Sequence, residues 1–219
     1  MSRDGTPELF VHTEVVAPFE ENARVIGDRE TGEGVLVDPG GQVDALLHAA
    51  GNAGIDVQAI WLTHAHLDHV TGVNAAVELL GDVPILLHPD DAQLYEAVVQ
   101  QGMMFGFPVD APAPVTDWLS TGQDLALGRR SARVLHLPGH APGHVGFWFS
   151  GQRTLLSGDV LFSGSIGRTD LPGGDYATLM QSITAQVLPL GDDVRVLSGH
   201  GPDTTVGRER VSNPFLQGR

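Results

Sequence analysis

The 219-residue chain contains no cysteine. This absence excludes disulfides and thiolate metal ligands, so any bound metal must be held by histidine and carboxylate side chains. A structural zinc site of the cysteine type is excluded with it, whereas a catalytic site is not. The chain also lacks an apolar run of about twenty residues, the length that crosses a bilayer, so we expect no membrane span.

Positive charge is scarce as well. The 12 Lys and Arg residues face 27 Asp and Glu residues, which gives a formal net charge of −15. Such a charge repels phosphate backbones, so we expect no nucleic-acid partner. The short basic clusters at Arg129-Arg130 and at Arg208 with Arg210 are expected to be solvated surface. Residues 1–7 lack the apolar core of a signal peptide, which favours the cytoplasm.

The hydrophobic pattern predicts a layered α/β protein. An apolar content of 42% is enough for a core, and we expect residues 1–219 to form one domain. Helical periods predict helices over 43–50, 70–80, 89–98 and 176–187, and residues 101–114 show no period and are predicted as a loop. Strands are predicted at 9–16, 22–27, 34–38, 57–62, 84–88, 124–127, 132–137, 145–149, 154–156 and 194–197. Two β-rich halves with outer helices predict a four-layer αββα sandwich.

The stretch from Thr63 to His69 holds four metal-capable side chains within six residues: His64, His66, Asp68 and His69. It follows the apolar run 57–62, which predicts a buried strand. Ligands at the end of a strand are held rigidly, as a metal site requires. The sequence therefore predicts a metal site here.

Three further ligand-type residues follow predicted strands in the same way. They are His140, Asp159 and His200, and each comes directly after a glycine. Glycine lets the backbone turn sharply and approach a ligand closely. Core packing does not explain why three predicted strands are each followed by a glycine and a ligand-type residue, so we expect these residues to join the site.

The remaining histidines are expected to have other roles. His144 lies in the same loop as His140 and is expected to order that loop, or to support the metal ligands from outside, rather than to bind a metal. Four others, which are His12, His48, His88 and His136, have no ligand context and are predicted to be structural or exposed.

The stretch 63–69, followed along the chain by Gly139-His140, Gly158-Asp159 and Gly199-His200, resembles the motifs of the metallo-β-lactamase superfamily. Within it, the segment 163–175 with its Gly-Arg-Thr-Asp run and the tail 199–209 are similar to type II glyoxalases, the hydroxyacylglutathione hydrolases, and to their short bacterial members. Longer type II glyoxalases carry a C-terminal helical domain that contacts glutathione, and this chain shows no counterpart. We therefore consider Met103, Met104, Phe105 and Phe107 either as an apolar substrate wall or as packing residues.

The resemblance implies two divalent metal ions, zinc by default, with iron or manganese as alternatives. It implies that His64, His66 and His140 bind one ion, that Asp68, His69 and His200 bind the other, and that Asp159 bridges them. The implied reaction is attack of a shared hydroxide on the thioester of S-lactoylglutathione, which yields lactate and glutathione. Asp159 and Asp68 are the implied catalytic residues, with Asp68 holding or relaying the proton of the nucleophile.

Other chemistries fit the same ligands. Glutathione persulfide dioxygenases of the superfamily share the Gly-Arg-Thr-Asp run, and His64, His140 and Asp159 form the two-histidine, one-carboxylate set of mononuclear non-haem iron enzymes. The Gly-His-Gly context of His200 favours the hydrolase. β-Lactam or phosphodiester hydrolysis is a further alternative, and a non-catalytic metal-binding protein is disfavoured because no ligand is missing.

Three more positions carry expectations. Arg168 is expected in a buried pair that holds its loop, with contact to substrate carboxylates as the alternative. Trp61 is expected in the core, and residues 213–215 are expected to pack the tail. The sequence leaves the oligomeric state open.

Overall fold

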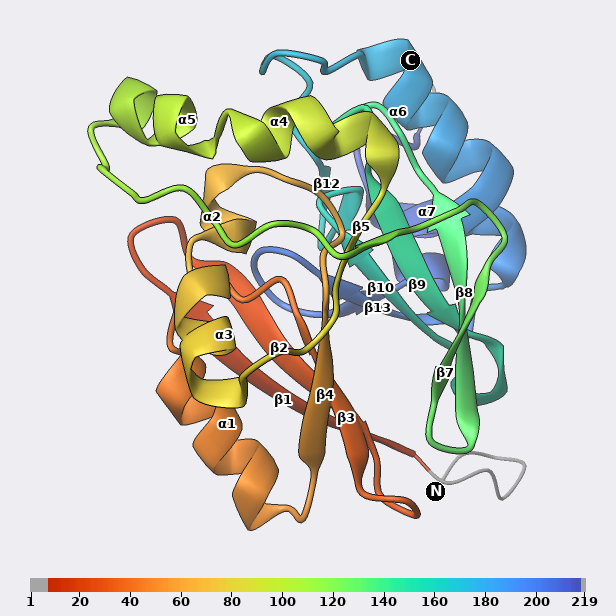
Figure 1. The fold of residues 1–219 in the computed structure, drawn as a ribbon. Helices are drawn as coiled ribbons and strands as arrows, with labels where there is room; N and C mark the ends of the chain where they lie inside the picture. Colours follow the sequence, from red (N-terminus) through yellow and green to blue (C-terminus); the bar gives the residue numbers. More distant parts are fainter. Residues whose placement is uncertain (1–7, 218–219) are drawn as a thin grey trace.

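Two six-stranded mixed sheets pack face to face and carry helices on their outer faces (Figure 1). The computed structural model describes residues 8–217, so the segment 1–7, where we expect no signal peptide, lies outside the described residues. The first sheet has the order β1 (Leu9–Val16), β2 (Glu21–Asp28), β3 (Glu33–Val37), β4 (Asp56–Trp61), β5 (Ile85–Leu87) and β6 (Asp117–Trp118). The second has the order β14 (Thr204–Thr205), β13 (Arg195–Ser198), β10 (Thr154–Gly158), β9 (Val145–Phe149), β8 (Arg130–His136) and β7 (Asp124–Leu127).

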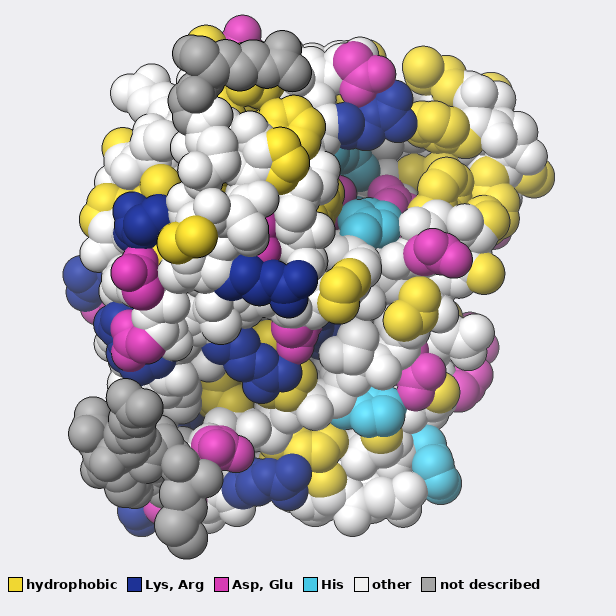
Figure 2. Space-filling model, turned by 180° about the vertical axis from the view of Figure 1, so that it is seen from behind, with side chains coloured by type: hydrophobic (Ala, Val, Ile, Leu, Met, Phe, Trp, Pro, Cys, Tyr) yellow, Lys and Arg dark blue, Asp and Glu magenta, His cyan; other side chains and the backbone are white. Residues whose placement is uncertain are grey.

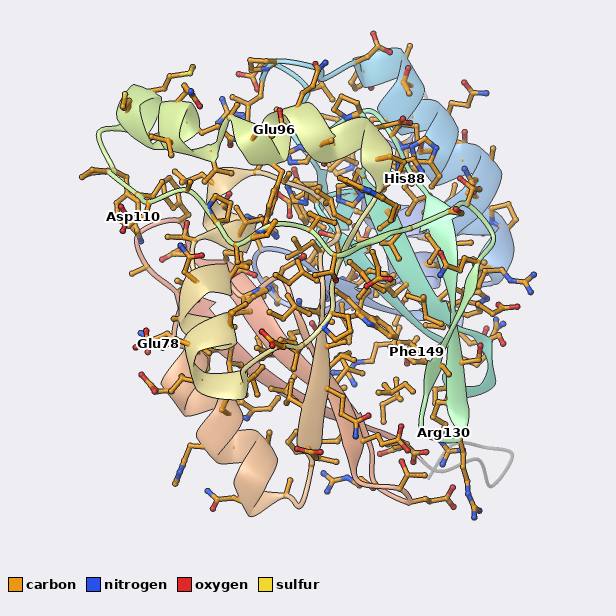
Figure 3. The ribbon with its side chains drawn as sticks, viewed as in Figure 1. Glu78, His88, Glu96, Asp110, Arg130 and Phe149 are labelled. Carbon is orange, nitrogen blue, oxygen red and sulfur yellow. The ribbon has the colours of Figure 1, made fainter. Side chains whose placement is uncertain are left out.

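Successive side chains along each strand point to opposite faces of its sheet, and this alternation divides the core into three layers. Ile60 of β4 faces the helices outside the first sheet, and its neighbour Trp61 faces the second sheet. Trp61 is 3% exposed and lies against Phe147, with ring centroids 5.1 Å apart. Phe149, labelled in Figure 3, belongs to the same layer. The four-layer αββα sandwich is therefore confirmed, and Trp61 lies in the core as expected.

The outer helices bury apolar side chains against the two sheets. Outside the first sheet lie α1 (Val43–Asn52) and α3 (Val73–Leu80), and α1 buries Val43, Leu46 and Ala50 at helical spacing. Outside the second sheet lie α6 (Tyr176–Ser182), its continuations η3 (Ile183–Val187) and η4 (Leu188–Leu190), and α7 (Val206–Ser212). Within residues 8–217, no helix is long and apolar enough to cross a membrane.

The prediction of a loop over 101–114 is wrong in its first part, because α5 (Val98–Phe105) continues to Phe105. Met103 and Met104 of this helix are 72% and 70% exposed, so its apolar residues do not form a single stripe. The expected helix over 70–80 is divided into α2 (Leu67–Val70) and α3, and the helix expected over 89–98 begins as η1 (Pro89–Asp91) and continues as α4 (Ala92–Glu96).

Several elements are absent from the sequence prediction. They are α7 and the two-residue strands β6, β14, β11 (Leu161–Phe162) and β12 (Ser165–Ile166), and strands this short show no alternation. Asn213 in the tail is fully buried and donates through Nδ2 to the Ser165 carbonyl at 2.9 Å, whereas Phe215 is 45% exposed. The tail is therefore packed through Asn213 rather than Phe215.

The carboxyl ends of four strands meet at one edge of the sandwich. Both β3–β4 and β10–β13 are parallel pairs, and β8 runs in the direction of β10 because each is antiparallel to β9. The N–H of Val145 donates to the Thr63 carbonyl at 2.8 Å and joins the two sheets at this edge. The segments that follow β4, β8, β10 and β13 therefore come together.

Candidate metal centre

Three imidazoles converge at the edge of the sandwich. His66 Nδ1 lies 2.8 Å from His140 Nε2, and His64 Nε2 lies 3.2 Å from the same atom. Nitrogen atoms of a tetrahedral zinc site, at about 2.0–2.1 Å from the ion, lie about 3.3 Å apart. The spacing of this group therefore fits a shared cation.

The protonation states of these three imidazoles also suit the binding of a metal ion. Burial lowers the pKa of His64 and His140, and burial together with the neighbouring His140 lowers the pKa of His66 to about 3. All three imidazoles are therefore neutral at pH 7, with lone pairs free to bind a metal.

Two of these rings are oriented by hydrogen bonds on their outer nitrogens. His140 Nδ1 donates to the Arg168 carbonyl at 2.7 Å, and His64 Nδ1 donates to the Thr63 hydroxyl at 3.0 Å. The Thr63 hydroxyl in turn donates to Asp38 Oδ2 at 2.7 Å. Partners of this kind fix the tautomer and the ring orientation of metal-binding histidines.

A second group consists of Asp68, His69 and His200. Asp68 Oδ2 lies 3.1 Å from His200 Nε2 and 3.7 Å from His69 Nε2. Burial opposes a charge on His200, but hydrogen bonds to Asp159 and Asp68 outweigh it and raise its pKa to about 10. The pKa of His69 is also raised well above its usual range, since Asp159 and Asp68 outweigh its burial. Attraction between the two imidazolium rings and the neighbouring carboxylates therefore holds this group together.

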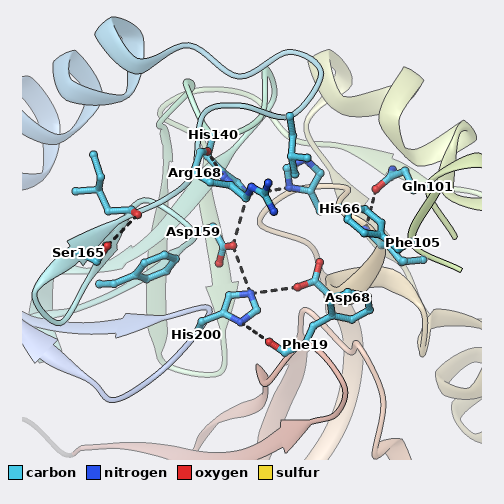
Figure 4. Close-up of a pocket in the computed structure, with 14 residues that line it drawn as sticks. Phe19, His66, Asp68, Gln101, Phe105, His140, Asp159, Ser165, Arg168 and His200 are labelled. Carbon is cyan, nitrogen blue, oxygen red and sulfur yellow. Dashed lines mark hydrogen bonds and ion pairs between the residues drawn. The ribbon is translucent and has the colours of Figure 1, made fainter. Parts of the chain in front are cut away.

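Asp159 lies between the two groups, as Figure 4 shows. Its Oδ2 is 3.5 Å from His140 Nε2 and 3.4 Å from His200 Nε2, and its Oδ1 is 3.5 Å from His69 Nε2. Both Asp159 Oδ1 and His69 Nε2 are buried and have no hydrogen-bond partner among the described residues. Buried polar atoms without partners are costly, so this pair of atoms fits a site that binds cations.

The glycine before His200 has a steric reason. A Cβ atom at Gly199 would lie 2.0 Å from Asp159 Oδ1 and 2.9 Å from His69 Cε1. Only glycine lets β13 approach the other ligand segments this closely.

His144 contacts the site without joining either group. Its Nε2 accepts a hydrogen bond from the Asp159 N–H at 3.0 Å, and its ring stacks on His64 with centroids 4.8 Å apart. With that nitrogen engaged, His144 holds the backbone of Asp159, in line with the ordering role expected for it.

Two buried carboxylates beside the site are missing from the sequence prediction. Asp38 accepts the Thr63 N–H at 2.6 Å, and its Oδ2 lies 3.1 Å from His69 Nδ1. Its position after a buried strand and before Pro-Gly-Gly is the signal that reveals it. Glu21 is fully buried with no hydrogen-bond partner on either oxygen among residues 8–217, and burial raises its pKa. No sequence signal marks Glu21.

The prediction that His88 and His136 have no ligand context is wrong, because the two rings and Asp90 lie close together. Their rings stack with centroids 4.4 Å apart, and Asp90 Oδ2 lies within 3.8 Å of both. However, His136 Nε2 lies 3.0 Å from the Pro142 carbonyl, and His88 Nδ1 accepts the Asp90 N–H at 3.3 Å. Because backbone groups already engage these nitrogens, we read this group as structural.

A cavity of about 360 Å³ opens over the two groups. Figure 2 shows a histidine surface in a hollow beside a cluster of apolar side chains. The apolar wall is formed by Phe19, Leu67, Phe105, Phe162, Ile166 and Leu171. Phe105 packs edge-to-face on Phe19 with centroids 6.0 Å apart, and of the four residues considered for an apolar wall it is the one that lines this cavity among the described residues.

Arg168 also lines this cavity, and the expected buried pair is wrong. Its guanidinium makes two hydrogen bonds to Asp170, at 2.7 and 2.8 Å, but the two side chains are 55% and 69% exposed. The loop is held instead by the Arg168 carbonyl, which accepts from His140. The side chain faces the cavity as an exposed ion pair with Asp170.

Comparison with known proteins places these features in a wider group. Residues 17–200 match the family model described as the metallo-beta-lactamase superfamily. The chain is 39% identical over 208 residues to hydroxyacylglutathione hydrolase GloC of Haemophilus influenzae, covering 93% of this chain and 96% of that protein. It is similar to the solved structure of the BLEG-1 B3 metallo-beta-lactamase, with a TM-score of 0.88 and 37% identity, covering 95% of this chain and 100% of that one. It is also similar to TTHA1623 in a di-iron-bound form, with a TM-score of 0.85 and 42% identity, covering 94% and 100%.

Proposed function

Because this chain belongs to the metallo-beta-lactamase superfamily, we propose that it is a metal-dependent hydrolase of thioesters, with S-lactoylglutathione as the model substrate. The observation that carries the proposal is the pair of donor groups that share Asp159 at the floor of the cavity. The 39% identity to a hydroxyacylglutathione hydrolase supports the choice of substrate.

We assign each donor group to one divalent ion. His64, His66 and His140 would hold the first, and Asp68, His69 and His200 would hold the second. Asp159 would contribute to both, which the contacts of its two oxygens with both groups support. Zinc is the default ion, and the di-iron form of TTHA1623 makes iron the alternative. Two such ions supply a strong nucleophile from water at neutral pH and polarise a carbonyl.

The carboxylates of the chain supply the remaining chemistry. Burial raises the pKa of Asp68, but His69 and His200 outweigh it, so the pKa is lowered and Asp68 is ionised at neutral pH. Asp68 can therefore take and relay the proton of the attacking water. The thiolate product, with a thiol pKa of about 8.5 as in free cysteine, leaves without a dedicated acid. The apolar wall around Phe19 and Phe105 excludes bulk water, and Arg168 meets the anionic end of the substrate.

The position of His66 bears on the dioxygenase alternative. A mononuclear iron centre of the two-histidine, one-carboxylate type would use His64, His140 and Asp159. Here His66 Nδ1 lies 2.8 Å from His140 Nε2 and is part of the same group. This arrangement supports a three-imidazole site. Because Asp159 Oδ2 also lies 3.5 Å from His140 Nε2, the choice of the hydrolase rests on the Gly-His-Gly context of His200 and on the following test.

A substrate panel tests the proposal. Zinc-loaded protein should release thiol from S-lactoylglutathione, lose this activity on chelation and regain it with added Zn²⁺. The same preparation is given nitrocefin, a β-lactam, and an iron-loaded preparation is given glutathione persulfide in an oxygen electrode. No thioester cleavage together with oxygen uptake and one iron per chain would replace the proposal by the dioxygenase. Cleavage of nitrocefin alone would replace it by a β-lactamase.

A further inference from the structure

Asp91 connects two of the segments that carry candidate ligands. It ends η1, and its side chain is fully buried. Its Oδ2 accepts the N–H of Ala65 at 2.9 Å, and its Oδ1 accepts the N–H of Gly143 at 2.5 Å. Ala65 stands between His64 and His66, and Gly143 stands three residues after His140. One carboxylate therefore bonds to the backbone of both loops.

We propose that Asp91 is a positioning residue that sets the distance of His140 from His64 and His66, and with it the metal affinity of this three-imidazole group. The inference rests on the assignment of these histidines to a metal ion in the proposed function, and it does not depend on the choice of substrate.

The chemistry of the contact requires a carboxylate. Asp91 uses one acceptor oxygen for each N–H, and hydrogen bonds to an ionised acceptor are the stronger kind. Asparagine offers one oxygen and one NH₂ group. One of the two backbone N–H groups would therefore face the NH₂ group, and two donors form no hydrogen bond. Burial raises the pKa of Asp91 to about 6, and the two N–H bonds oppose this rise, so the side chain is ionised at pH 7 and above.

The packing around Gly143 shows how closely this loop is held. A Cβ atom at Gly143 would lie 2.5 Å from the Asp91 nitrogen and 2.9 Å from Asp91 Oδ1. The loop thus rests directly on Asp91, and a change in that side chain shifts the loop that carries His140.

Gln101 on α5 gives a contrast. Its Oε1 accepts the Leu67 N–H at 2.9 Å, and its Nε2 donates to the carbonyls of Ala65 at 3.0 Å and Leu94 at 2.8 Å. These bonds hold the first loop from another element and do not reach the second. The first loop therefore keeps a support when Asp91 is changed, whereas the loop of His140 loses one.

The test measures Zn²⁺ affinity of the full chain by competition with a chelating dye. Asp91→Asn is placed in two backgrounds: His200→Ala, which keeps the three-imidazole group, and His66→Ala, which keeps the other group. We expect affinity to fall about 10- to 100-fold in the His200→Ala background, the usual effect of losing a residue that orients metal ligands. In the His66→Ala background we expect little change.

Asp90→Asn is the matched control, because this neighbouring side chain is 57% exposed and should leave both affinities unchanged. An unchanged affinity in the His200→Ala background, or an equal loss in both backgrounds, would overturn the inference while leaving the proposed function in place. Failure of the parent protein to bind Zn²⁺ would overturn both. If Asp91→Asn does not fold, Asp91→Glu keeps both oxygens one methylene further out and must show the same selectivity for the His200→Ala background.

Discussion

Asp38 Oδ2 lies 3.1 Å from His69 Nδ1, and the same oxygen accepts the Thr63 hydroxyl that orients His64. A single buried carboxylate therefore contacts His69 of one candidate ligand group directly and reaches His64 of the other through the Thr63 hydroxyl. Its backbone has a φ of 48°, in the left-handed region that asparagine also tolerates.

Replacing Asp38 by asparagine should weaken metal binding at both groups, since the substitution keeps the backbone conformation but removes the charged acceptor. The expected loss is about 10- to 100-fold in Zn²⁺ affinity, measured by chelator competition. Asp44→Asn, at an exposed position of α1, is the control. An Asp38→Asn protein with parental affinity at both groups would show that this carboxylate serves folding alone.

Loss of Asp159 should lower the metal content of both sites, because its oxygens face both groups. Asp159→Ala is expected to retain less than one ion per chain after gel filtration, measured by elemental analysis. Asp170→Ala, which removes an exposed carboxylate at the cavity mouth, should keep the parental content. Full metal content with normal activity in Asp159→Ala would contradict the bridging role.

The two groups should differ in the pH dependence of metal binding. In metal-free protein the raised pKa of His200, about 10, keeps it protonated at pH 7–9, and a metal must displace that proton. Affinity in the His66→Ala background should therefore rise by at least about tenfold per pH unit over this range, because His69, whose pKa is also raised, can lose a proton as well. The three-imidazole group has lowered pKa values and is already neutral, so its affinity in the His200→Ala background should rise much less. Equal slopes, measured with a pH-corrected chelator, would refute this difference.

Trp61 should dominate the stability of the layer between the sheets. Trp61→Ala removes a ring that is 3% exposed and should lower the free energy of unfolding by about 3–5 kcal/mol, measured by urea titration of metal-loaded protein. Trp118→Ala offers a matched control, since this ring is 50% exposed and its loss should cost at most about 0.5 kcal/mol. Similar losses in the free energy of unfolding for the two substitutions would argue against the burial of Trp61 between the sheets.

Arg168 should contribute to substrate affinity rather than turnover. Arg168→Gln is expected to raise KM for S-lactoylglutathione by up to about fivefold, as for an exposed ion pair worth at most about 1 kcal/mol, with little change in kcat. Asp170→Asn frees the guanidinium and should lower KM. An S-acyl N-acetylcysteamine, which lacks carboxylates, should respond to neither substitution. Equal effects on both substrates would assign Arg168 to its loop alone.

The local sequence pattern was enough to predict the layered fold and to identify the candidate ligands. Strand alternation and helical period are properties of neighbouring residues, so they predict β4, β9 and α1 and the four-layer arrangement. Each candidate ligand lies in a segment that follows one of the strands β4, β8, β10 and β13, and the carboxyl ends of these strands meet at one edge, which explains why the structure brings all seven residues together. The predicted roles of these seven residues remain proposals.

Contacts between distant segments could not be read in the same way. The exposed methionines of α5 hide its helical period, and the exposed position of Arg168 depends on how its loop packs.

The sequence by itself determined the architecture, the absence of thiolate ligands and the set of histidines and aspartates available to a metal, because these follow from composition and short-range period. Only the tertiary structure showed how closely these side chains gather around Asp159, and that Asp38, Asp91 and Gln101 support them. Those supports act through hydrogen bonds between residues 25 or more positions apart, and such bonds leave no local pattern in the chain.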